Sequence, residues 1–153
     1  TNTKGSKKLL SIYQLLLNIL ILFHMKIFII SNANIGKKFF GRPCLLLIHK
    51  GARTNLIRKS VLVYYKEKET FIIVASNGGS KNNPSWYHNL SKNKIAKVKI
   101  GKKTYKVTAK EILGDEKTSY WNKIDRINRG GYTKYQTMTS RSIPVFKLNI
   151  FNS

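Results

Sequence analysis

The residues best suited to binding or chemistry follow an apolar run, Phe71–Ala75, whose β-branched composition predicts a buried strand. The next four residues, Ser76–Gly79, offer a hydroxyl, an amide and two glycines, and glycine reaches positive φ without a Cβ clash. Asn83 and Pro84 then predict the start of a short helix with asparagine as its N-cap. Free backbone N–H groups at such a corner can hold an anionic or carbonyl-rich ligand. A tight strand-to-helix connection without a ligand explains the same spacing, and spacing alone favours it.

A second group of chemically capable residues, Arg53, Thr54 and Arg58, lies in a predicted polar loop over Lys50–Ser60. Arginine presents a planar fork of donors that matches the oxygens of a phosphate or a carboxylate. A solvated basic loop in a basic protein is the competing interpretation. Because the loop joins strands next to Phe71–Ala75, we expect it to meet the strand-to-helix corner at one edge of the sheet.

Two pairs of aromatic residues are candidates to line such a site. Trp86 and Tyr87 are neighbours in the predicted short helix and cannot both face the core, so one is free to line a pocket or stack on a flat ring. Tyr132 and Tyr135 lie three residues apart, and two phenols on one helical face can donate hydrogen bonds to a carbonyl or nitro oxygen. Two half-buried tyrosines without such a role fit the spacing equally well.

The composition excludes several classes of function. Lys and Arg total 29 against 6 Asp and Glu, and the net charge of +23 attracts polyanions such as nucleic acid, anionic lipid or a phosphorylated cofactor. The scattered acidic residues argue against a two-carboxylate hydrolase and a magnesium site. The single cysteine, Cys44, excludes a disulfide within the chain, and His24, His49 and His88 lack ligand spacing, so we predict no metal. Nucleotide-binding glycine loops and a nucleophile elbow are absent from the sequence, and Ser76 has no partners for a hydrolytic triad.

The long apolar stretch Leu9–Ile30 has three interpretations. It is a secretory signal ending at the small-x-small motif Ser31–Ala33, a membrane-spanning anchor, or a helix lying on a bilayer surface or on the domain. Lys26 and the length of the stretch weaken the first. We prefer a membrane-associated helix, which places the protein in the cytoplasm at the inner face of the cell membrane. The chain begins at Thr1, and Met25 is a candidate natural start.

Residues 36–153 read as one domain that follows an N-terminal segment of residues 1–35. Strands outnumber helices and occur in hairpin order, which predicts a mainly β fold, a small antiparallel β-barrel with peripheral helices. A helix is predicted to begin with Asp115 as its N-cap and to end at Gly130–Gly131. The predicted strands are Pro43–His49, Val61–Tyr65, Phe71–Ala75, Ile95–Ile100, Thr104–Ala109 and Pro144–Ile150.

The motifs found between Gly36 and Ile150 are, in order, Gly51-Ala-Arg-Thr-Asn, Arg58, Ala75-Ser-Asn-Gly-Gly, Asn83-Pro-Ser-Trp-Tyr-His-Asn-Leu, Tyr132-x-x-Tyr-Gln and Arg141-x-Ile-Pro. In this order they resemble the deazaflavin-dependent nitroreductase family, which uses 8-hydroxy-5-deazaflavin (coenzyme F-420). The resemblance implies a split β-barrel of the FMN-binding, pyridoxamine-oxidase-like type. It also implies two-electron hydride transfer from the reduced coenzyme to a quinone, a nitro compound or a similar acceptor.

The resemblance also assigns roles to individual residues. It implies that Ser76, Tyr132 and Tyr135 face the substrate and are catalytic. The residues that it implies on one side of the coenzyme, at its phosphate and ring edge, are Arg53, Thr54, Arg58, Lys59, Ser60, Val61 and Leu62. Those that it implies on the other side are Val74, Ala75, Ser76, Asn77, Ser85, Trp86, Tyr87 and Asn89.

Departures from the family pattern leave alternatives open. Where the family commonly has Gly-Arg-Lys-Ser/Thr-Gly, Ala52 removes a cation and Asn55 replaces a glycine, although asparagine tolerates a left-handed conformation. Val63 and Arg129 replace aromatic residues of members that act on nitroimidazoles, which argues against that acceptor. FMN in the same fold is the alternative cofactor.

Two other classes of function compete with the oxidoreductase. A basic β-barrel that binds nucleic acid would need its aromatic residues on strand faces, whereas here they cluster at turns and helix starts, so nucleic acid is not expected as a partner. A membrane-bound carrier that holds the coenzyme without turnover has the same sequence features as the enzyme. Related barrels often dimerise, so a homodimer is a candidate assembly, and the sequence leaves the oligomeric state open.

Overall fold

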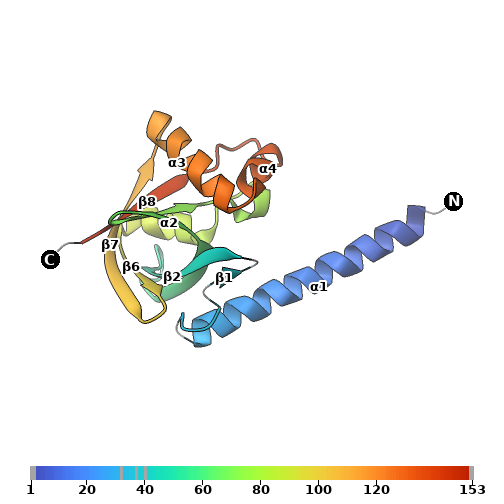
Figure 1. Cartoon of the computed structure of the whole chain (residues 1–153), viewed down its shortest axis with the longest axis horizontal. Coiled ribbons are helices and arrows are strands. Elements are labelled where there is room, and N and C mark those ends of the chain that lie inside the picture. Colours follow the sequence, from blue (N-terminus) through green and yellow to red (C-terminus); the bar gives the residue numbers. More distant parts are fainter. Residues whose placement is uncertain (1–2, 32, 37, 40, 152–153) are drawn as a thin grey trace.

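The computed structural model describes residues 3–31, 33–36, 38–39 and 41–151, and Figure 1 shows it as a curved sheet with helices around it. The mainly β prediction is therefore confirmed. The elements are α1 (Thr3–Ile30), β1 (Lys38–Phe39), β2 (Arg42–Lys50), β3 (Ile57–Val63), β4 (Tyr65–Glu67), β5 (Thr70–Val74), the short 3-10 turn η1 (Asn77–Gly79), α2 (Ser85–Lys92), β6 (Ile95–Ile100), β7 (Lys103–Ile112), α3 (Gly114–Ile127), α4 (Gly131–Thr137) and β8 (Val145–Ile150).

The strands of the described residues form one antiparallel sheet that curves around an apolar interior. Its order is β2–β6–β7–β8–β5–β4, and β1 and β3 also pair with β2. Leu45 and Leu47 of β2 share one buried cluster with Phe71 and Ile73 of β5, although β6, β7 and β8 lie between those two strands in the sheet. Helix α2 adds Trp86 to the same cluster. This shared interior is what positions α2 against the strands that carry the basic loop.

Helices cover parts of the outer face of the sheet. Ile124 of α3 and Tyr132 of α4 pack in one cluster with Val145 of β8. Phe28, near the end of α1, packs in another cluster with Leu46 of β2. Strand β2 is therefore apolar on both faces because each face is covered, as the unbroken apolar run predicted.

The predicted loop Lys50–Ser60 is shorter than expected, because β3 begins at Ile57 and not at Val61. Residues 57–60 pair with Leu47–Lys50 of β2, so their backbone groups enter the sheet ladder despite the polar side chains. The second predicted strand in fact spans the end of β3 and the beginning of β4. Three candidate binding residues, Arg58, Lys59 and Ser60, therefore lie on a paired strand and not in a loop.

Both predicted N-caps are wrong by one or two residues. The N-cap of α2 is Pro84, because the side chain of Asn83 is occupied as the acceptor of a 2.7 Å hydrogen bond from Arg141 Nη1. The N-cap of α3 is Leu113, and Asp115 lies in the first turn, where its charge interacts favourably with the helix dipole.

Helix α1 projects away from the domain and contacts it through its C-terminal end (Figure 1). His24 Nε2 lies 3.1 Å from the carbonyl oxygen of Gly36, and Phe28 is fully buried. In the part of the chain that the structure describes, no helix has the length and apolar character needed to span a membrane. Asn32, in the middle of the predicted cleavage motif, lies outside the described residues.

The interior cluster predicts a stability difference between two apolar side chains. Phe71→Ala is expected to lower the free energy of unfolding by about 3–5 kcal/mol, because the ring is fully buried (0% exposed) and its loss leaves a cavity. Ile57→Ala is the control, since its side chain is 66% exposed and its loss is expected to change stability by about 0.5 kcal/mol or less. Urea unfolding followed by circular dichroism measures both, and equal losses would contradict this core.

Candidate functional site

The predicted strand-to-helix corner is present, and its backbone is left-handed over three successive residues. Asn77, Gly78 and Gly79 have φ values of 47°, 61° and 80°. A Cβ on Gly79 would lie 3.0 Å from the carbonyl oxygen of Tyr135 and 3.0 Å from Cβ of Met138. This glycine therefore lets the corner pack closely against α4, and the prediction that both glycines supply positive φ is confirmed.

Arg141 holds the corner together. Its Nη2 donates to the carbonyl oxygens of Ala75 (3.1 Å) and Ser76 (2.7 Å), and its Nε donates to that of Ser80 (2.9 Å). Its Nη1 donates to Oδ1 of Asn83 at 2.7 Å. One guanidinium group thus satisfies three carbonyl oxygens of the corner and fixes its backbone.

Gln136 in turn holds Arg141. Its Nε2 donates to the Arg141 carbonyl oxygen at 2.8 Å, and its Oε1 accepts from the backbone N–H of Ile143 at 2.9 Å. Sequence reasoning gave neither residue a role, since the partners of the guanidinium lie 58 to 66 residues away along the chain. The only signal was their presence in the motifs that carry the family resemblance.

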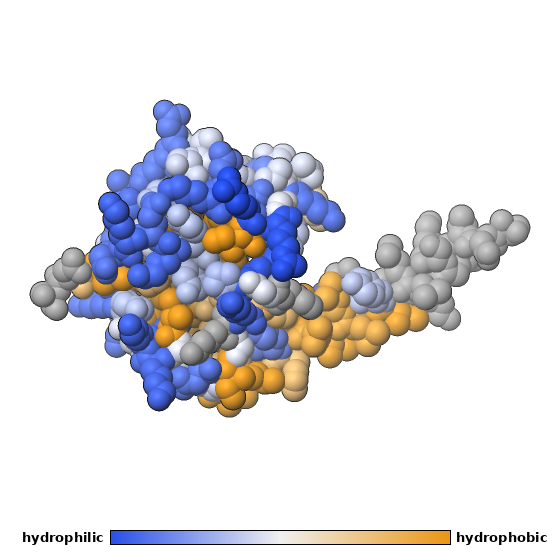
Figure 2. Space-filling model, viewed as in Figure 1, coloured by the Kyte–Doolittle hydropathy of each residue, from blue (hydrophilic) through white to orange (hydrophobic). Residues whose placement is uncertain are grey.

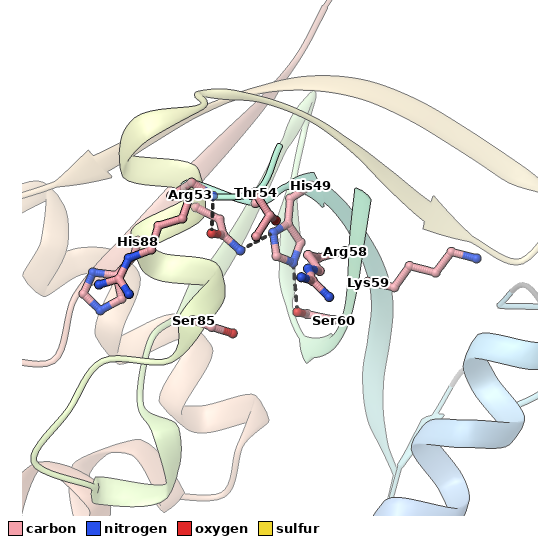
Figure 3. A pocket seen from close by; sticks show the side chains of 11 residues that line it. His49, Arg53, Thr54, Arg58, Lys59, Ser60, Ser85 and His88 are labelled. Carbon is pink, nitrogen blue, oxygen red and sulfur yellow. Dashed lines mark hydrogen bonds between the residues drawn. The ribbon is translucent and has the colours of Figure 1, made fainter. Parts of the chain in front are cut away.

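A pocket of about 490 Å³ lies where the loop after β2 meets β3 and α2 (Figure 3). Three of its side chains are cationic, those of Arg53, Arg58 and Lys59, and none of the described residues that line it is acidic. Arg58 and Ser60 lie beside His49, whereas Lys59 points away, as alternation along a strand requires (Figure 3). The pocket therefore suits an anion. Its lining residues are His49, Gly51, Ala52, Arg53, Thr54, Arg58, Lys59, Ser60, Ser85, His88 and Asn89.

One chain of hydrogen bonds ties the walls of this pocket together. His49 is 2% exposed, and its Nε2 lies 3.0 Å from Ser60 Oγ. Its Nδ1 lies 3.1 Å from Nδ2 of Asn89. The Oδ1 of Asn89 accepts from the backbone N–H of Ala52 at 2.8 Å, and Lys92 Nζ donates to the Ala52 carbonyl oxygen at 2.8 Å. The chain joins β2, β3, α2 and the basic loop.

The imidazole in this chain is neutral at pH 7. Burial, and to a smaller extent the nearby Arg58 guanidinium, lowers the pKa of His49 to about 4. Sequence reasoning considered His49 only as a metal ligand, and its alternation with the buried leucines of β2 was the signal that it faces inward. Among the described residues no group of three His, Cys, Asp or Glu side chains could hold a metal ion, and a metal-free protein stays a prediction.

The two departures from the family loop have a structural explanation. Asn55 has a φ of 57°, the left-handed conformation expected where it replaces glycine, and its N–H donates to the Gly51 carbonyl oxygen at 3.0 Å. Ala52 contributes its backbone N–H and carbonyl oxygen to the hydrogen-bond chain. The loop therefore keeps its form without the cation that the family commonly has at this position.

The structure divides the predicted coenzyme-binding residues into two groups. Those that line the pocket are Arg53, Thr54, Arg58, Lys59, Ser60, Ser85 and Asn89. Those that lie elsewhere are Val61 under α1, Leu62, Ala75, Trp86 and Tyr87 at the interior cluster, Val74 under α3 and α4, and Ser76 and Asn77 at the corner. Trp86 is buried, and the Tyr87 hydroxyl donates to Glu111 Oε2 at 3.4 Å, so neither aromatic ring lines the pocket.

The predicted catalytic residues lie together at a different place, around the corner and α4. Helix α4 packs on η1, which follows Ser76 directly. Tyr132 is 6% exposed, and burial raises the pKa of its phenol, so the hydroxyl stays protonated. Tyr135 is half-buried on the same short helix. The structure thus brings Tyr135 next to the corner and separates all three residues from the basic pocket.

Comparisons with known proteins agree with this geometry. Residues 22–149 match the family model described as "F420H(2)-dependent quinone reductase". The F420H(2)-dependent quinone reductase Rv1261c of Mycobacterium tuberculosis is 37% identical over 132 residues, which cover 84% of this chain and 89% of the relative.

Solved structures give the same result. The F420-H2 dependent reductase FDR-A has a TM-score of 0.65 and 35% identity over 71% of this chain and 95% of its own. A structure described as a domain-swapped dimer has a TM-score of 0.67 and 32% identity over 79% of this chain and 91% of its own. A pyridoxamine 5'-phosphate oxidase homologue from Listeria innocua, with 14% identity and a TM-score of 0.51 over 71% of this chain and 84% of its own, shares the fold alone. The predicted split β-barrel, oxidoreductase class and deazaflavin coenzyme are confirmed, and the chain belongs to the F420H(2)-dependent quinone reductase family.

Proposed function

We propose that the basic pocket holds the phosphate and the acidic tail of reduced coenzyme F-420, and that the enzyme delivers the hydride to a quinone or a similar acceptor beside the corner. The observation that carries this proposal is a pocket with Arg53, Arg58 and Lys59 and no described acidic lining residue. Charge-assisted hydrogen bonds of this kind are about twice as strong as neutral ones. The coenzyme supplies the hydride when bound, and the protein supplies position and field.

The pocket has donors that fit an oxygen-rich anion. The hydroxyls of Thr54, Ser60 and Ser85 line it together with the guanidinium groups. In this proposal the flat ring system extends from the pocket toward Ser76 and Asn77 at the corner. Val74, Ala75, Trp86 and Tyr87 lie in the packed clusters beneath and support these positions without contacting the ring. Residues 36–153 form the catalytic domain.

The acceptor oxygen gains negative charge when hydride arrives, and hydrogen-bond donors near it lower the barrier. We assign this role to the hydroxyls of Ser76 and Tyr135, with Tyr132 as a protonated phenol behind them. The support is the packing of α4 against η1 and the burial that keeps the Tyr132 phenol protonated. Arg141 fixes the backbone of Ser76 through the 2.7 Å bond to its carbonyl oxygen.

Coenzyme binding is the direct test of the pocket. Arg58→Ala is expected to weaken binding of coenzyme F-420 by about 10- to 100-fold, because a hydrogen bond to a charged group is lost. Tryptophan fluorescence quenching at near-physiological salt measures the dissociation constant. Lys102→Ala removes the same charge from the exposed β6–β7 turn and is the matched control. If FMN quenches the fluorescence saturably and coenzyme F-420 does not, FMN is the cofactor of the pocket. If only single-stranded DNA binds, the proposal is overturned.

The catalytic assignment predicts a change in turnover without a change in coenzyme binding. Tyr135→Phe is expected to lower kcat for quinone reduction by about tenfold or more, because a donor to the developing oxyanion is lost. Tyr120→Phe is the control, since the Tyr120 hydroxyl donates to Glu67 at 2.9 Å and lies outside the proposed site. Steady-state kinetics with a soluble quinone separates kcat from KM. Equal rates for both variants would exclude Tyr135 from catalysis.

We propose that the chain contacts a membrane through α1 and that it forms a homodimer. Exposed apolar side chains gather along α1, and Figure 2 shows them as a continuous apolar surface that projects from the domain. The segment of residues 1–35 is therefore proposed to lie on the inner surface of the cell membrane, with the catalytic domain in the cytoplasm.

The structure described as a domain-swapped dimer, related over 79% of this chain, supports a homodimer. Analytical ultracentrifugation of the full chain tests the dimer.

Vesicle binding tests the role of α1. Leu16→Asp with Phe23→Asp is expected to reduce co-sedimentation with phosphatidylglycerol vesicles at least severalfold, because these side chains are 60% and 62% exposed and charge is costly in the bilayer interface. Ser119→Asp, an exposed position on α3, is the control for added negative charge. Unchanged sedimentation of the α1 variant would contradict the proposed membrane contact.

A further inference from the structure

The buried His49 has no role in the function proposed above, although it contacts two walls of the basic pocket and reaches a third through Asn89. It bridges Asn89 on α2 and Ser60 on β3, and through Asn89 it reaches the backbone of Ala52 in the loop (Figure 3). Charged ligands of the pocket would be bound by Arg53 and Arg58. A neutral ring at the centre of such a cationic site calls for a physical explanation.

The direction of each hydrogen bond that links Ala52, Asn89, His49 and Ser60 follows from one donor. The backbone N–H of Ala52 can only donate, so the Asn89 atom at 2.8 Å from it is the oxygen, and the Asn89 NH₂ faces the ring. His49 Nδ1, 3.1 Å from that NH₂, must then accept. The remaining ring nitrogen, Nε2, carries the proton and donates to Ser60 Oγ at 3.0 Å. The hydroxyl proton of Ser60 is therefore free to be donated elsewhere.

We propose that His49 is a positioning residue of the coenzyme site, a neutral relay that occupies the acceptor side of Ser60 and thereby directs the Ser60 O–H into the pocket as a donor to an anionic oxygen. The proposal rests on the proposed function of the pocket. Arg58 and Ser60 lie two residues apart on one face of β3, so the guanidinium and the hydroxyl address the same ligand. The same ring locks Asn89, which holds the loop through Ala52.

Protonation of the ring would break the relay. His49⁺ would present an N–H at Nδ1 to the NH₂ of Asn89, and two donors would face each other. The Arg58 guanidinium opposes this charge, and the other cationic side chains that line the pocket are Arg53 and Lys59, of which Lys59 points away from the ring. Because the pKa of about 4 lies below the unfolded value of about 6.5, the relay contributes stability that is fully present above pH 6.5 and is lost as pH falls toward 4.

Nitrogen NMR of the histidine rings in the full chain tests the relay without any coenzyme. The expected spectrum has one ring in the Nε2–H tautomer that does not titrate between pH 8 and pH 5.5, and that signal disappears in His49→Gln. If the signal that His49→Gln removes belongs to an Nδ1–H tautomer, or titrates near pH 6.5, the proposal is overturned. This result does not depend on whether the pocket binds the coenzyme.

A double-mutant cycle tests the effect on the ligand. His49→Leu and Ser60→Ala are each expected to weaken coenzyme F-420 binding by about tenfold, and the double variant by little more than either alone, because both remove the same donor. His49→Gln is expected to restore most of the affinity, since its amide can accept from Asn89 and donate to Ser60. If the losses of affinity are additive, His49 has a structural role only. The same conclusion follows if the affinity of His49→Leu falls only in proportion to its thermal stability.

Controls separate failure of the relay from failure of the pocket. His88→Leu removes an exposed imidazole that lines the same pocket but takes no part in the hydrogen-bond chain, so the coupling between positions 49 and 60 is expected to persist in that background. If Arg58→Ala binds the coenzyme as tightly as the unchanged chain, the pocket is not the coenzyme site. If Arg58→Ala weakens binding and the cycle is additive, the pocket stands and the relay is wrong.

Discussion

The basic pocket depends on the register of the ladder between β2 and β3. His49 lies opposite Arg58, and Leu47 lies opposite Ser60. Because side chains alternate along a strand, a slip of one residue would turn Arg58 and Ser60 away from His49 and bring Lys59 beside it. Leu62 of β3 packs on the interior cluster and Val61 packs in the cluster under α1, and such a slip would exchange the faces of these two side chains. The apolar core therefore sets the position of the cationic groups.

In helix α2, too, burial of one face orients the residues of another face, here with the periodicity of a helix. Trp86 and Leu90, four residues apart, are buried in the interior. Ser85 and Asn89 are also four residues apart and line the pocket on another face of the helix. Burial of Trp86 and Leu90 thus orients Ser85 and Asn89 toward the pocket. The core and the site share one set of elements.

Much of this arrangement could be predicted from local sequence. Runs of β-branched and aliphatic residues predicted most of the strands, and Gly78 and Gly79 predicted the left-handed corner, because backbone conformation there depends on the residues themselves. The basic loop was recognised from its two arginines, although part of it is strand: pairing with β2 overrides polar composition. The predicted cap at Asn83 failed, and the side chain instead accepts a hydrogen bond from a guanidinium far away in the chain.

Other features could not be predicted from spacing. Arg141 contacts residues far away in the chain, and His49 becomes meaningful only when α2 is packed beside β2. Both are long-range effects, in which a donor or acceptor finds its partner through the tertiary fold. The family resemblance identified most of the residues of the pocket, whereas the structure alone showed that the neutral ring of His49 joins the walls of the pocket and that Arg141 holds the corner.

The buried cysteine has a consequence for chemical durability. Quinones are electrophiles that alkylate thiolates, so an oxidoreductase of a quinone-reducing family is exposed to inactivation by the compounds it turns over. Cys44, the single cysteine of the chain, is 3% exposed, and burial raises the pKa of its thiol to about 11. At pH 7 only about one such thiol in ten thousand is ionised. The core that stabilises the fold thus also shields its one soft nucleophile from covalent modification.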